Sequence, residues 1–125
     1  MNILVCEDEV LIRKVVKAQL ENDGYTVKAV CDGKQGLFAM EHQSFDLIML
    51  DLLMPFVNGF EFMSLIKQSP YSNVPIIVLS KLGDKKTIDL VYSLGAEYYI
   101  IKPFDPNELS LIVAAVLKRQ HVIAV

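Results

Sequence analysis

The chain has 125 residues, of which 53% are hydrophobic, and its formal net charge is −3. This length suits one domain with a core of its own and is too short for two, and the high apolar fraction argues against disorder. The acidic balance argues against nucleic-acid binding by this segment, because phosphate binding needs a basic face.

The ends and cysteines of the chain favour a cytoplasmic protein. The N-terminus has no basic leader and reaches acidic residues by Glu7, which is not typical of a signal peptide. No apolar run is long enough to span a membrane. Cys6 and Cys31 fit neither a metal-binding spacing nor a disulfide framework, so we expect reduced thiols.

Short apolar runs typical of buried strands alternate along the chain with segments whose apolar residues recur at helical spacing. In chain order we expect a strand at 3–6, a helix at 10–20, a strand at 25–30, a helix at 33–42, a strand at 45–50, a helix at 58–68, a strand at 74–79, a helix at 84–93, a strand at 97–101 and a helix at 106–118.

This alternation predicts an α/β fold. Strands joined by helices must be parallel, with helices on both faces of the sheet, and the continuous Ile, Leu and Val runs suit strands buried on both faces. We assign residues 1–118 to this domain and residues 119–125 to a tail or the start of a linker.

One carboxylate, Asp51, has the most informative position. It follows the apolar run at 45–50, which stops abruptly before Met54 and Pro55. In an open parallel sheet the carboxyl ends of the strands lie along one edge, where ligands bind. The residues that follow the other strands are expected at the same edge; they are Glu7, Asp8, Ser80, Lys81, Lys102 and Pro103.

These side chains suit phosphoryl transfer. Three close carboxylates need a compensating cation, and oxygen ligands without His or Cys favour Mg²⁺. Lys102 supplies positive charge for an oxyanion, and Ser80 can donate a hydrogen bond to another oxygen. A carboxylate nucleophile, a metal ion, a lysine and a hydroxyl could together place a phosphoryl group on Asp51.

At this point the chain resembles a known family. Residues 1–118 are similar to the receiver domain of bacterial two-component response regulators, and the resemblance rests on Glu7-Asp8, Asp51 with Met54-Pro55 and Gly59, Ser80, and Lys102-Pro103-Phe104. It implies a flavodoxin-like sheet with five strands in the order 2-1-3-4-5. It also implies phosphorylation of Asp51 by a histidine kinase or phosphotransfer protein, without turnover of an external substrate.

The resemblance implies further roles for particular residues. Mg²⁺, or Mn²⁺, would be held by Asp8, Asp51 and the backbone carbonyl of Leu53, with Glu7 acting through water. A cis peptide bond before Pro103 would aim Lys102 into the site. Ser80 and Tyr99 would form a switch. When the hydroxyl moves toward the phosphoryl group, the ring of Tyr99 turns inward and the face of the fourth helix, fifth strand and fifth helix changes shape. Tyr98 should lie on the opposite face of its strand from Tyr99.

Three residues near the site are expected to influence the rates of phosphorylation and dephosphorylation. Lys81 stands where the family usually has a small residue, and we expect it to alter the rate of phosphorylation or dephosphorylation. Leu53 and Leu82 flank the expected path of the attacking water. Because neither can orient water, we expect slow self-dephosphorylation. Glu9 is expected to be only a charge at the start of a helix.

The last expected helix is apolar nearly all round, which indicates a covered surface. Leu111, Ile112, Val113 and Val116 leave few polar positions on it, and Ile112 stands where dimerising relatives usually carry a basic residue. A homodimer, or the docking of a partner or output domain, is therefore expected through the face of the fourth helix, fifth strand and fifth helix.

Two other functions remain open. An aspartyl phosphatase on a similar sheet would have a second acid two residues after the nucleophile, but that position is Leu53, so a general acid is missing. The other is a phosphorylation-independent, receiver-like interaction module. The acids and Lys102 argue against it, whereas Lys81 leaves it open.

Overall fold

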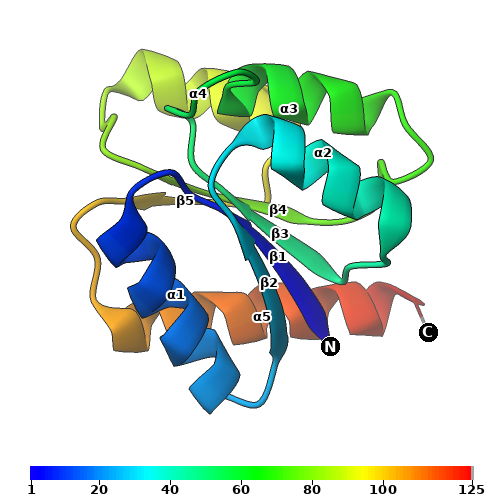
Figure 1. The fold of residues 1–125 in the computed structure, drawn as a ribbon, viewed down its shortest axis with the longest axis vertical. Coiled ribbons are helices and arrows are strands. Elements are labelled where there is room, and N and C mark those ends of the chain that lie inside the picture. Colours follow the sequence, from blue (N-terminus) through cyan, green and yellow to red (C-terminus); the bar gives the residue numbers. More distant parts are fainter. Residues whose placement is uncertain (125) are drawn as a thin grey trace.

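The structure is a computed structural model, which describes the backbone of residues 1–124 and the side chains of residues 1–119. Within this part of the chain, five strands and five helices alternate (Figure 1). Their bounds are β1 (Asn2–Cys6), α1 (Val10–Asn22), β2 (Thr26–Val30), α2 (Gly33–His42), β3 (Leu47–Leu50), α3 (Gly59–Lys67), β4 (Ile76–Ser80), α4 (Lys85–Ser93), β5 (Tyr98–Ile101) and α5 (Pro106–Ala124).

The strands form one parallel sheet in the order β2-β1-β3-β4-β5. The predicted fold class and strand order are therefore confirmed. Figure 1 shows α2, α3 and α4 on one face of the sheet and α1 and α5 on the other. Each face has its own buried apolar cluster, and Phe62 lies in the first while Val113 lies in the second. β3 and β4 are buried along their whole length, as both-face coverage requires.

Three helices begin at side-chain caps. The carboxylates of Asp32 and Asp84 accept the backbone N–H three residues further on, at 2.8 and 3.0 Å, and the Asn58 side chain does the same at 2.9 Å. Such caps satisfy backbone donors that the first helical turn leaves free. They fix where α2, α4 and α3 begin, and thus the loops that join them to the preceding strands.

Some element boundaries differ from the prediction. β3 begins at Leu47, opposite Ile3, and not at residue 45. Asp46 instead forms hydrogen bonds with Asn2, at 2.7 Å in each direction, just before the ladder begins. α5 continues past Lys118 to Ala124. The tail expected at 119–125 thus starts as a continuation of this helix, and Val125 lies outside the described residues.

Two glycines allow helices to approach the loop that follows β3. A Cβ on Gly59 would lie 2.6 Å from both the backbone carbonyl oxygen of Asp51 and the Cα of Leu52. A Cβ on Gly33 would overlap the backbone carbonyl oxygen of Val57. The starts of α2 and α3 therefore pack directly against this loop, which holds the residue at the tip of β3 in place.

Candidate functional site

The carboxyl ends of β1, β3, β4 and β5 bring the predicted residues together at one edge of the sheet. Backbone hydrogen bonds extend the ladder into this edge. The Asp51 N–H donates to the Cys6 carbonyl at 3.0 Å, and the Lys102 N–H donates to the Ser80 carbonyl at 2.8 Å. The positions of Asp51 and Lys102 are therefore fixed by strand pairing and not by loop packing alone. The peptide bond between Lys102 and Pro103 is cis.

An acidic cluster forms the centre of this edge. Carboxylate oxygens of Glu7, Asp8 and Asp51 all lie within 4.8 Å of one another. Glu7 is 1% exposed and Asp51 is 3% exposed, whereas Asp8 is more open to solvent. Three acids at this separation, two of them buried, are costly unless a cation compensates them.

The buried side chain of Lys102 provides part of that compensation. Its Nζ lies 2.6 Å from Glu7 Oε1 and 3.4 Å from Asp51 Oδ2. Burial raises the pKa of Glu7 to about 7, against the pull of Lys102 and with a further rise from Asp51. Burial also raises the pKa of Asp51. Desolvation alone would lower the pKa of Lys102, but the surrounding carboxylates outweigh it and raise that pKa. One ammonium thus leaves this cluster short of positive charge.

The remaining charge deficit fits a divalent metal ion. Asp8 Oδ1 is buried and has no hydrogen-bond partner in the described part of the chain. It belongs to a set of oxygen ligands with no His or Cys, which is the donor chemistry of hard ions such as Mg²⁺. The acidic cluster could therefore bind a divalent metal.

Ser80 and Tyr99 meet at the backbone of one residue, Leu82. The Leu82 N–H donates to the buried Ser80 hydroxyl at 3.2 Å, and the Tyr99 hydroxyl donates to the Leu82 carbonyl. Tyr99 is 7% exposed and Tyr98 is 42% exposed, as expected for neighbours on opposite faces of a strand. The ring of Tyr99 is thus buried in this structure.

Two charged residues in contact with this edge were not predicted from the sequence. Glu9 was expected to be only a helix-start charge, but its Oε1 lies 3.0 Å from Lys81 Nζ and 3.6 Å from Lys102 Nζ. Arg13 Nη1 donates to the backbone carbonyls of Glu7 and Asp8 at 2.9 and 3.4 Å. The position of Glu9 directly after Asp8 in the sequence could have indicated that its side chain lies near this edge. Arg13 lies on α1, where helical periodicity alone gives no sign of a contact with β1.

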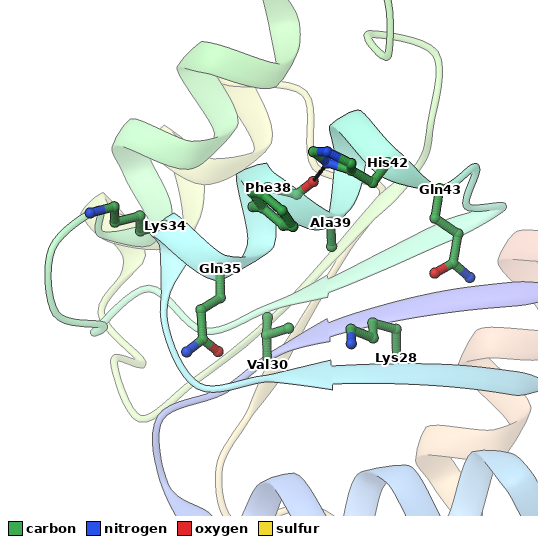
Figure 2. Close-up of a pocket in the computed structure, with 8 residues that line it drawn as sticks. All are labelled: Lys28, Val30, Lys34, Gln35, Phe38, Ala39, His42 and Gln43. Atoms are coloured by element: carbon green, nitrogen blue, oxygen red, sulfur yellow. Dashed lines mark hydrogen bonds between the residues drawn. The ribbon is translucent and has the colours of Figure 1, made fainter.

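A separate hollow of about 470 Å³ lies between α2 and the edge strand β2 (Figure 2). In it Phe38 stacks on His42 with ring centroids 4.1 Å apart, and His42 Nδ1 lies 2.8 Å from the Phe38 carbonyl oxygen. The hollow is lined by Lys28, Val30, Lys34, Gln35, Phe38, Ala39, His42 and Gln43. None of the residues at the acidic edge lines it, so the candidate site does not include this hollow.

In the part of the chain that the structure describes, no helix combines the length and apolar character needed to cross a membrane.

Comparisons with known proteins agree on one family. A family model for the response regulator receiver domain matches residues 3–114. Response regulator ArlR of Staphylococcus saprophyticus is 40% identical over 120 residues, which cover 94% of this chain and 53% of that protein. Response regulator RR06 of Streptococcus pneumoniae is 39% identical over 123 residues, which cover 98% of this chain and 56% of that protein.

A solved structure agrees with the same family. The receiver domain of the Francisella response regulator 1452 has a TM-score of 0.89 at 29% identity, and the match covers 94% of this chain and 97% of that one. The chain spans about half the length of the curated relatives it matches.

Proposed function

Because the chain belongs to the response regulator receiver domain family, we propose that it is a phospho-accepting signalling domain in which Asp51 receives the phosphoryl group. The donor is a histidine kinase or a phosphotransfer protein. The observation that carries the proposal is the position of Asp51. Its buried carboxylate lies at the tip of β3, inside the acidic cluster and 3.4 Å from the ammonium of Lys102.

In the proposed mechanism, an oxygen of Asp51 attacks phosphorus, and the rest of the site neutralises charge. Lys102 pairs with a phosphoryl oxygen, and the Ser80 hydroxyl donates a hydrogen bond to another. Mg²⁺, or Mn²⁺, would be held by Asp8, Asp51 and the Leu53 carbonyl, with Glu7 acting through water. When bound, the ion would neutralise phosphoryl oxygens. The partnerless Asp8 Oδ1 supports this assignment.

The signal would leave the site through Ser80 and Tyr99. Both contact the backbone of Leu82, so a movement of the Ser80 hydroxyl toward the phosphoryl group would alter the support of the Tyr99 ring. The face formed by α4, β5 and α5 carries exposed apolar side chains, among them Leu90, Ile101 and Leu111. A homodimer partner or an output domain would dock there.

The family and the chain's composition set the cellular context. A receiver domain is not a conventional enzyme. It would promote its own phosphorylation and dephosphorylation, in the cytoplasm, without binding nucleic acid through residues 1–118.

Loss of the acceptor should abolish phosphorylation. After treatment with acetyl phosphate and Mg²⁺, the wild-type protein should gain one phosphoryl group by intact mass, and Asp51→Asn should gain none, because the amide is not a nucleophile. Asp89→Asn, which removes an exposed carboxylate on α4, is the matched control and should behave as wild type. A folded wild-type protein that gains no mass would contradict the proposal and favour the phosphorylation-independent interaction module.

The phosphorylated state should be long-lived. Leu53 is 52% exposed and Leu82 is half-buried, and neither side chain can orient an attacking water. Leu53→Asn and Leu82→Glu should therefore shorten the half-life of the phosphorylated protein severalfold, measured by the decay of the phosphorylated mass after the donor is removed. Unchanged half-lives in both variants would show that water access is controlled elsewhere.

A further inference from the structure

A row of charges of alternating sign leads from the surface to the buried acids. The Lys81 ammonium lies 3.0 Å from Glu9 Oε1, and the same oxygen lies 3.6 Å from Lys102 Nζ. Lys102 Nζ lies 2.6 Å from Glu7 Oε1. Through Glu9, the exposed ion pair is therefore connected to the buried one.

This ion pair differs from an ordinary surface pair. Most exposed pairs contribute little, and Lys85 with Asp89 on α4 is of that kind, at 2.6 Å with side chains 89% and 61% exposed. The Glu9–Lys81 pair instead joins two separate elements, since Glu9 precedes α1 and Lys81 follows β4. Its carboxylate also contacts the buried ammonium of Lys102.

Glu9 places a negative charge where an anion must arrive. The ammonium of Lys102 is the group that would meet a phosphoryl oxygen, and Glu9 competes for it at 3.6 Å. A glutamate side chain is ionised at neutral pH, and the Lys81 ammonium pairs with the Glu9 carboxylate at 3.0 Å. Without Lys81, this charge would face an incoming anionic donor with only Lys102 to offset it.

We propose that the Glu9–Lys81 ion pair controls how readily an anionic phosphodonor reaches Asp51, because Lys81 cancels the charge that Glu9 presents to the donor. The inference rests on the proposed function. With acetyl phosphate, an Asp51 oxygen forms a bond to phosphorus while the bond from phosphorus to the acetyl oxygen breaks, and acetate leaves with the bonding electrons. Glu9 and Lys81 take no part in these bonds and act as positioning residues.

The test measures the second-order rate constant of phosphorylation at limiting acetyl phosphate in the presence of Mg²⁺. Lys81→Ala should lower it roughly two- to fivefold, the range expected for one exposed charge pair, and Lys81→Arg should restore it. Glu9→Gln/Lys81→Ala should be close to wild type, because the uncompensated carboxylate is gone. The defect of Lys81→Ala should shrink as salt rises, since salt screens exposed charges, and the thermal midpoint should stay unchanged.

Lys85→Ala is the matched control, because it removes a lysine whose ion pair in the described structure is with Asp89 on its own helix α4 and not with an acid of the cluster. Its rate should equal that of wild type. The proposal is overturned if Lys81→Ala is as fast as wild type, if Lys85→Ala is slowed equally, or if the double variant stays as slow as Lys81→Ala. If wild type itself takes up no phosphoryl group while remaining folded, the proposed function fails as well, which separates the two failures.

Discussion

Lys102→Met should lower the free energy of unfolding at pH 8 by roughly 3–5 kcal/mol, the usual cost of removing one partner from a buried ion pair. The variant loses the ammonium that lies 2.6 Å from Glu7 and 3.4 Å from Asp51. The two carboxylates then remain buried without their cation. Phosphoryl uptake should also be lost, because no other lysine in the described structure reaches Asp51 within ion-pair distance.

The measurement is urea unfolding at pH 8 and pH 5, with Lys118→Met as a control that removes an exposed lysine from α5. The destabilisation should be smaller at pH 5, because protonation of the acids removes the unpaired charge. Equal midpoints for Lys102→Met and Lys118→Met at pH 8, with unchanged denaturant slopes, would show that the buried ammonium does not stabilise the fold.

The second large effect is a fall in stability with rising pH in the absence of divalent metal. Burial raises the pKa of Glu7 from 4.5 to about 7, so the folded protein holds a proton that the unfolded chain has lost. The associated stability is fully present below pH 4.5 and is lost as pH rises through about 7. Because raising a pKa by one corresponds to about 1.4 kcal/mol, the loss of stability is roughly 3 kcal/mol.

Other titrating groups affect this pH window in known directions. Asp51 also has a raised pKa and adds to the fall. Lys102 has a raised pKa, and its contribution is lost only at pH values above the ordinary lysine range. The lowered pKa values of Glu9 and Asp84 act below this window, where their contributions are lost as pH falls. Between pH 4.5 and about 7, the net change in stability should therefore be a decrease with rising pH, as Glu7 alone predicts.

Chemical denaturation between pH 4.5 and pH 8 in chelator measures this effect. Glu7→Gln should flatten the pH profile and be more stable than wild type at pH 8, because a neutral amide replaces a buried charge. Mg²⁺ should stabilise wild type more at pH 8 than at pH 5, since proton and metal compete for the same oxygens. A wild-type stability that rises steadily across this range would contradict the assignment.

Much of the fold and site follows from local rules. Alternating apolar runs and helical segments require a parallel sheet, and a parallel sheet places the residue after each strand at one edge. Asp8, Asp51 and Lys102 could be singled out for that reason alone, before any contact was known. Caps such as Asp32 and Asn58 depend on local chemistry, because each side chain accepts a hydrogen bond from a backbone N–H three residues further on.

What could not be predicted depends on tertiary geometry. The contact of Arg13 with the backbone of Glu7 depends on how α1 lies against β1, which apolar periodicity does not specify. The pairing of Glu9 with Lys81 joins residues far apart in sequence through long, flexible side chains. The start of β3 at Leu47 depends on its register with Ile3, and a run of apolar residues in the sequence does not define that register.

The tight approach of Gly33 and Gly59 to the loop after β3 has a consequence for mutational tolerance. Neither glycine carries a functional group, yet a methyl group at either position would overlap the loop that seats Asp51. In a saturation mutagenesis experiment scored by signalling output, both positions should therefore be as intolerant as the acids themselves. A map of sensitive positions would then extend from the acidic edge to the starts of α2 and α3, where a glycine backbone lies directly against the loop.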